Sequence, residues 1–115
     1  MTIEEFYEEI GSDYNDVIAR LCSKDLIKKF VLIFSTDENF AKFSSAYERS
    51  DFDEAFRDVH TLKGLCLNLG FDRLANACIA LTEALRGGKN EATPQMLDEL
   101  NNDYNEVIAA IRKIS

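Results

Sequence analysis

A histidine, a lysine and a glycine lie close enough along the chain to act together: His60, Lys63 and Gly64. On an α-helix, where residues are about 100° apart, Gly64 falls roughly 40° and Lys63 roughly 60° from His60, on opposite sides of it. Imidazole is largely neutral at pH 7 and has a ring nitrogen that can accept a phosphoryl group. A lysine one turn away can screen the phosphoryl oxygens. The pattern therefore indicates phosphoryl transfer on His60, the only histidine of the 115 residues.

The helix face around His60 carries further residues that suit contact with another protein. Glycine inside a helix costs about 0.5–1 kcal/mol relative to alanine, so Gly64 indicates that a partner approaches closely there. Leu67 and Phe56 fall about 20° and 40° from His60, and Arg57 lies on the opposite flank. Apolar side chains beside the histidine favour docking, although Phe56 fits a seam with a neighbouring helix equally well. The far side of the helix predicts a core: Leu62, Leu65, Cys66 and Leu69.

These residues resemble the signature of the histidine-containing phosphotransfer (Hpt) domains of multistep two-component signalling. That signature is His-x-x-Lys-Gly on a helix, with a second glycine six residues later, which is Gly70 here. The resemblance continues through residues 68–71 and 81–86, and more loosely over about residues 24–114. It implies that His60 is the phosphorylated nucleophile and that Lys63 stabilises the phosphate. Gly70 is expected to be structural, as a helix stop. Val59 departs mildly from the alanine that is frequent in the family, and we expect the core to repack around it.

The resemblance also implies a partner. In the family a response-regulator receiver domain, alone or in a hybrid sensor histidine kinase, supplies the reacting aspartate and Mg²⁺. The chain would then be a phosphocarrier with no autokinase activity and no cofactor of its own, and Gly64, Phe56, Arg57 and Leu67 would form the docking surround. The alternative is a helical docking module that binds receiver or kinase domains without being phosphorylated. A self-contained hydrolase is disfavoured because the single histidine leaves no evident nucleophile–base pair.

Composition excludes several other classes. A formal net charge of −8 argues against binding to nucleic acid or to an anionic membrane, because both need basic surfaces. The N-terminus lacks a basic, apolar signal-peptide pattern, so we expect a cytoplasmic protein. The start at Met1 with a capped first helix favours a free-standing carrier, and a piece of a larger sensor kinase stays open as the alternative. No long exposed apolar stripe is expected to remain, which favours a monomer. The acidic clusters are interpreted as solvated helix faces and caps, with no metal site. The three cysteines, Cys22, Cys66 and Cys78, are predicted to be buried free thiols.

The pattern of caps and apolar stripes predicts an all-α protein. Helices are expected to begin after Thr2, after Ser12 or Asp13, after Ser23, after Asp51, near Phe71 and after Thr93. The helix that follows Ser23 is long, with a kink or break near residues 35–38. The four long helices favour an antiparallel four-helix bundle with short additional N-terminal helices. We expect a single domain over residues 1–115, in which residues 1–22 form a helical lid and residues 23–115 form the bundle.

Overall fold

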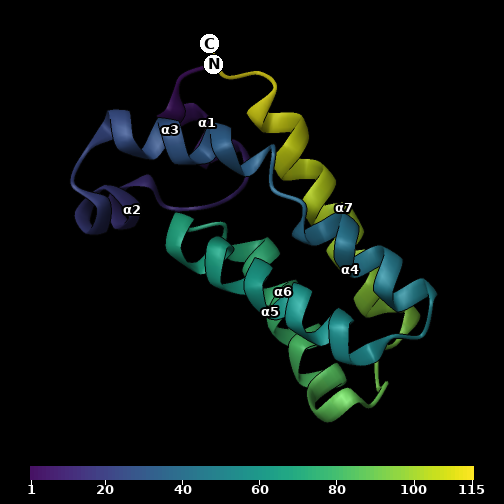
Figure 1. The fold of residues 1–115 in the computed structure, drawn as a ribbon. Coiled ribbons are helices and arrows are strands. Elements are labelled where there is room, and N and C mark those ends of the chain that lie inside the picture. The colour runs from purple at the N-terminus through teal and green to yellow at the C-terminus, as the bar shows by residue number, and fades with distance from the viewer.

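The computed structural model describes residues 1–115 and is helical throughout, with no strand. Seven α-helices follow one another along the chain (Figure 1). In order they are α1 (Ile3–Glu9), α2 (Tyr14–Leu21), α3 (Lys24–Phe34), α4 (Asn39–Glu48), α5 (Phe52–Leu69), α6 (Asp72–Leu85) and α7 (Pro94–Ile111), with a short 3₁₀ turn η1 (Arg86–Gly88) after α6. No helix combines the length and the apolar run that crossing a bilayer requires.

Side-chain caps explain where most of these helices begin. The hydroxyl of Thr2 accepts a hydrogen bond from the Glu5 backbone N–H, and the Glu5 carboxylate accepts one in return, which completes a capping box at α1. The side chains of Asp13, Ser23 and Thr93 likewise accept hydrogen bonds from backbone N–H groups at the starts of α2, α3 and α7. These starts confirm the sequence prediction, because each cap satisfies backbone donors that a helix N-terminus leaves unpaired.

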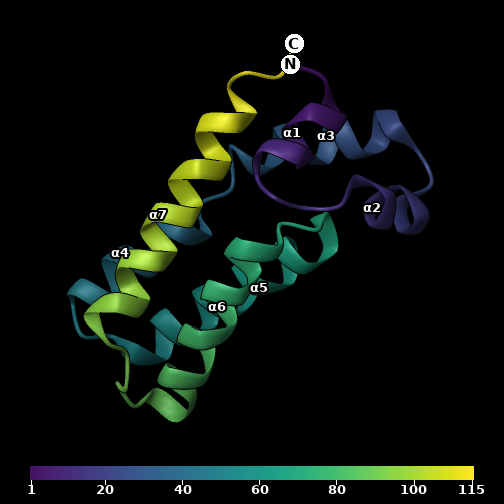
Figure 2. The same cartoon turned by 180° about the vertical axis from the view of Figure 1, so that it is seen from behind.

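The helices α4 to α7 form an antiparallel bundle in which each packs against the next along the chain (Figures 1 and 2). The bundle closes between its first and last members, where the rings of Phe40 on α4 and Tyr104 on α7 stack with centroids 3.9 Å apart. One contiguous cluster of 26 buried residues runs through the molecule. The predicted all-α bundle is therefore confirmed.

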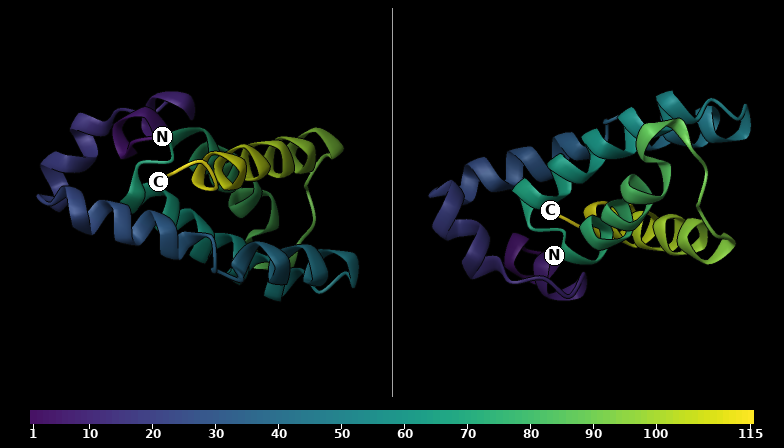
Figure 3. Two further views of the ribbon diagram at one scale, coloured as in Figure 1. Left: turned by 90° about the horizontal axis from the view of Figure 1, so that it is seen from above. Right: turned by 90° about the horizontal axis from the view of Figure 1, so that it is seen from below.

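A break separates α3 from α4 at residues 35–38, where the sequence predicted one. The hydroxyls of Ser35 and Thr36, which directly follow α3, donate hydrogen bonds to the carbonyls of Leu32 and Ile33. These bonds satisfy carbonyl groups in the last turn of the helix. Asp37 then accepts a hydrogen bond from the backbone N–H of Asn39 at the start of α4. Seen from above, α3 and α4 follow one another along one side of the molecule (Figure 3).

The N-terminal helices α1, α2 and α3 lie at the end of the bundle where α5 ends and α6 begins (Figure 1). The buried hydroxyl of Tyr7 donates to the Leu69 carbonyl over 2.6 Å. The rings of Phe6 and Phe34 meet Phe71 edge-on, with centroids 5.7 and 5.1 Å away. Contacts with α1 and α3 thus hold the turn between α5 and α6 in place. The boundary of this segment at residue 22 stays a prediction.

One of the expectations for the cysteines needs correction. Cys22 is exposed, because it is the left-handed residue that ends α2 and lies outside the apolar stripe of that helix. Cys66 and Cys78 are buried as expected. Leu26, Leu32 and Ile33 of α3 are exposed, but three such residues do not amount to a long apolar stripe. The cap of α5 differs from that of α1: Asp51 accepts a hydrogen bond from the Glu54 N–H, but the Glu54 carboxylate pairs with Arg49.

Gly70 provides a test of how tightly the α5–α6 turn is packed. It ends α5 with φ of 74°, and a β-carbon there would lie 2.4 Å from Cγ2 of the buried Val17. We predict that Gly70→Ala lowers the free energy of unfolding by about 3 kcal/mol, from left-handed strain plus overpacking. Gly87→Ala is the matched control, because its φ is 76° with open space around it; it should cost only about 1 kcal/mol. Equal losses in urea denaturation would contradict the packing argument.

Tyr7 gives the fold a predicted pH dependence. Burial raises the pKa of its phenol well above the ordinary value of 10, so the folded state favours the neutral form. Its contribution is complete below about pH 10 and is lost as the pH rises further, because the unfolded chain ionises first. We predict that Tyr7→Phe weakens the alkaline loss of stability, measured as the urea midpoint between about pH 8 and 11. Tyr104, whose pKa burial also raises, keeps part of the slope. An unchanged slope would contradict this prediction.

Candidate functional site

The direction of His60 is set by the opposite face of α5. That face is buried over its whole length by residues spaced three and four apart, namely Ala55, Val59, Leu62, Cys66 and Leu69. Packing this stripe against α4 and α6 leaves one side of the helix in contact with solvent. His60 lies on that side and is exposed, as the sequence predicted. Leu65, which the sequence placed with the core, is only half-buried.

Gly64 leaves bare backbone one turn from the histidine. A β-carbon built at this position meets no atom within 4 Å beyond its own helix, so no neighbouring helix needs the missing side chain. This observation removes helix packing as the reason for the glycine. The backbone here is open to an approaching molecule, next to the imidazole.

Phe56 lies beside two side chains, that of His60, as the sequence predicted, and that of Arg86, which was not predicted. Its ring is stacked near that of His60, with centroids 5.8 Å apart and planes 21° from parallel. The guanidinium carbon of Arg86 lies over the same ring, 5.4 Å from its centroid, in the geometry of a cation–π contact. Phe56 is half-buried and also packs on the core. Phe56 thus lines the seam with α6, and its ring also lies beside the exposed imidazole; its part in docking stays a prediction.

Lys63 is half-buried on the side of α5 that faces α6. Its positive charge acts on Glu83 of α6. The pKa of Glu83 is held below its ordinary value, first by hydrogen bonds from Arg86 and also by the positive charges of Lys63 and Lys89. Arg86 binds both carboxylate oxygens of Glu83, with separations of 2.7 and 3.2 Å. The charges of Arg86, Lys63 and Lys89 therefore all act on the carboxylate of Glu83.

The remaining residues of the docking surround are accessible. Leu67 is 50% exposed, which leaves its isobutyl group free for contact two turns from His60. Arg57 is exposed as well, and its backbone carbonyl accepts a hydrogen bond from the Thr61 hydroxyl. The structure thus brings Phe56, Gly64 and Leu67 to the face of His60. It places Arg57 beside them with no side-chain partner that would fix it.

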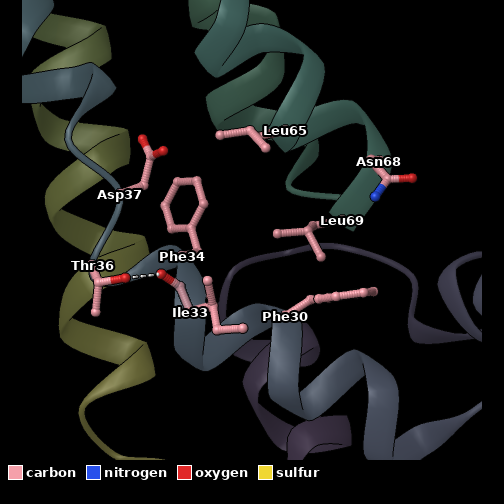
Figure 4. Close-up of a pocket in the computed structure, with 8 residues that line it drawn as sticks. All are labelled: Phe30, Ile33, Phe34, Thr36, Asp37, Leu65, Asn68 and Leu69. Atoms are coloured by element: carbon pink, nitrogen blue, oxygen red, sulfur yellow. Dashed lines mark hydrogen bonds between the residues drawn. The ribbon is translucent and has the colours of Figure 1, made fainter.

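An apolar groove borders this face on the α3 side (Figure 4). Its volume is about 370 Å³, and its walls come from the end of α3, the break after it and the C-terminal half of α5. The lining residues are Phe30, Ile33, Phe34, Thr36, Asp37, Leu65, Asn68 and Leu69. Ile33 at its rim is 52% exposed. The groove extends the accessible apolar surface from α5 onto α3.

Nearer the N-terminus of α5, the side of the helix that faces α4 is charged. A wide pocket of about 680 Å³ between α4 and α5 is lined mainly by Glu38, Lys42, Arg49, Glu54 and Asp58. Burial and the nearby Glu54 raise the pKa of Asp58, and one of its oxygens has no hydrogen-bond partner. Cations and carboxylates alternate here. No group of three or more histidine, cysteine, aspartate or glutamate side chains is placed to hold a metal ion.

Comparison with known families gives this arrangement a context. A family model described as the Hpt domain matches residues 31–110, which covers most of the chain and includes His60, Lys63, Gly64 and Gly70. The chain belongs to the Hpt domain family. Hpt domains are helical phosphocarriers that interact with receiver domains and histidine kinases in phosphorelays. No curated protein and no solved structure gave a match.

The sequence analysis missed Glu83 and Arg86 as neighbours of the site. Both lie within the stretch that resembles the family, but α5 alone carries no signal for them. Arg86 reaches Phe56 because α6 runs antiparallel to α5 and because its end turns back over α5 through Gly87 and Gly88, whose φ angles are 76° and 80°.

Gly64 gives a prediction on stability alone. Because its surroundings are open and the residue is helical, alanine fits without strain and removes the entropy cost of glycine. We predict that Gly64→Ala raises the free energy of unfolding by about 0.5–1 kcal/mol in urea denaturation. A loss of stability would show that the position makes a packing contact, and the docking interpretation of the glycine would then fail.

Proposed function

We propose that the chain carries a phosphoryl group on His60 and passes it between receiver-domain aspartates in a His-Asp phosphorelay. One observation supports this most: the only histidine of a chain in the Hpt family is exposed on a helix whose other face is buried. Bare backbone at Gly64 and the half-buried ammonium of Lys63 flank it. A nucleophile in this setting needs no further group from its own chain to receive a phosphoryl group.

The proposed transfer balances in atoms and charge. The lone pair of an unprotonated ring nitrogen of His60 attacks the phosphorus of an aspartyl phosphate. The bond between phosphorus and the aspartyl oxygen breaks, and its electron pair stays on the carboxylate of the partner. The other ring nitrogen keeps its proton or yields it to water. Lys63 screens the transferred oxygens, and the reverse sequence of bonds returns the group to an aspartate.

The partner is a receiver domain, alone or as part of a hybrid sensor histidine kinase, and it contributes the aspartate and Mg²⁺. Phe56, Gly64, Leu67 and the flanking Arg57 form the docking surface in this proposal, with the apolar groove next to Leu65 extending it. Apolar surface with a charged rim suits a transient interface. Amide chemical-shift changes on adding a receiver domain should fall on this face. Changes confined to α7 would contradict the proposed surface.

Two further properties belong to the proposal. We place the protein in the cytoplasm, where receiver domains and their kinases exchange phosphoryl groups, and cell fractionation would check this. We also propose that it acts as a monomer, with the exposed side chains of α3 covered only by the partner. A mass near 13.1 kDa by light scattering supports the monomer, and twice that mass contradicts it.

The phosphorylation site is tested by replacing the histidine. We predict that wild-type protein, mixed with a phosphorylated receiver domain and Mg²⁺, gains an acid-labile label, and that His60→Gln gains none. Because His60 is exposed, we do not expect its replacement to unfold the protein, and circular dichroism checks this directly. Equal labelling of His60→Gln would contradict the proposed site.

The same experiment separates the alternatives. Receiver binding without label on the wild-type chain would support the docking module that is not phosphorylated. Labelling from ATP by the chain alone would show an autokinase activity that the proposal excludes.

A further inference from the structure

Glu83 has an unusual position for an acidic residue next to a phosphorylation site. It accepts two hydrogen bonds from Arg86, with N–O separations of 2.7 and 3.2 Å. The same guanidinium lies over Phe56, 5.4 Å from the ring centroid, and that ring lies 5.8 Å from the ring of His60. These two separations place the guanidinium carbon within about 11 Å of the imidazole. The charge of Lys63 acts on Glu83 as well.

A phosphoryl group on His60 changes the balance of charge at this place. It adds close to two negative charges and three acceptor oxygens, on the side of α5 where Glu83 already carries one negative charge. The dianion repels the carboxylate and competes with it for the guanidinium, which binds phosphate through two parallel hydrogen bonds. The Arg86 side chain is long and half-exposed, so a rotation about its side-chain bonds moves it toward the histidine while Phe56 keeps it close.

We infer that Glu83 is a placeholder for the phosphoryl group: it holds Arg86 beside the empty site and releases it to the phosphorylated His60. This inference rests on the proposed phosphorylation of His60 and deepens it. Arg86 becomes a second cation for the phosphohistidine in addition to Lys63. Glu83 in turn keeps the phosphorylated form from becoming too stable to pass its group onward.

The two members of this ion pair therefore have opposite effects on the reaction. Removing the charge of Glu83 frees the cation and relieves repulsion, so it favours the phosphorylated form. Removing Arg86 takes away a cation and leaves the repulsion, so it disfavours that form. A purely structural ion pair behaves differently, because breaking it from either side has the same result for the fold.

The experiment measures how the phosphoryl group distributes at equilibrium between His60 and a receiver domain, with Mg²⁺ present. We expect Glu83→Gln to shift the equilibrium constant toward His60, and Arg86→Ala to shift it toward the receiver. Each shift should be about two- to five-fold, the size of exposed charge interactions. Arg86→Lys, which keeps the charge, should recover part of the loss. Urea denaturation should show similar small changes in stability for Glu83→Gln and Arg86→Ala.

A second Arg–Glu ion pair, which joins α6 to α7 away from His60, serves as the control. Arg73 and Glu106 are joined over 2.9 Å at the other end of α6, and Arg73→Ala and Glu106→Gln should leave the equilibrium unchanged. Shifts of Glu83→Gln and Arg86→Ala in the same direction, or no shift in either, would overturn the inference while wild-type labelling of His60 leaves the proposed function intact. Failure of the wild-type chain to accept any label would overturn both.

Discussion

The packing of one apolar stripe on α5 determines which side chains of this helix are exposed at the site. Residues spaced three and four apart bury one face of α5 from Ala55 to Leu69, and a rigid helix has no freedom to bury that face and also turn His60 inward. The end of the helix is locked as well, since Gly70 is seated against Val17 and the Tyr7 hydroxyl binds the Leu69 carbonyl. The exposure of His60 is therefore a consequence of the core, with no dedicated loop required.

The neighbouring helices then give the two edges of this face different characters. On the α6 side, Glu83 and Arg86 bring charge close to the imidazole, and Phe56 connects that charge to the ring. On the α3 side, the groove lined by Phe30 and Ile33 is mainly apolar. A partner that covers His60 meets a charged border along one edge and an apolar border along the other. In the proposed complex this asymmetry would favour one docking orientation, because only one direction matches both borders.

Much of this architecture was predictable from the sequence, because the signals are local. Caps such as Thr2, Ser23 and Thr93 act within one turn, and the helical period of apolar residues defines the buried face without knowledge of the partners. The outward position of His60 and the break near Ser35 follow from the same rules. Assignment of the chain to the Hpt family came from the residues around His60 and agrees with the family match.

The features that could not be predicted depend on contacts between distant parts of the chain. Arg86 lies 30 positions after Phe56, and nothing in either segment says that the two side chains meet. The exposure of Cys22 depends on a left-handed helix end, and the exposed residues of α3 depend on how the N-terminal helices lean on the bundle. Tertiary placement, rather than propensity, decides each of these cases.

The central claim is that the core of α5 presents His60 as the phosphoryl acceptor, and a single histidine makes it directly measurable. With ¹⁵N-labelled histidine, long-range proton–nitrogen NMR reports the two ring nitrogens of His60 alone. We predict that adding a phosphorylated receiver domain and Mg²⁺ moves one ring nitrogen to the shift of a phosphorus–nitrogen bond, while the amide spectrum keeps the pattern of the folded bundle. Label on the chain with an unchanged imidazole spectrum would contradict the account.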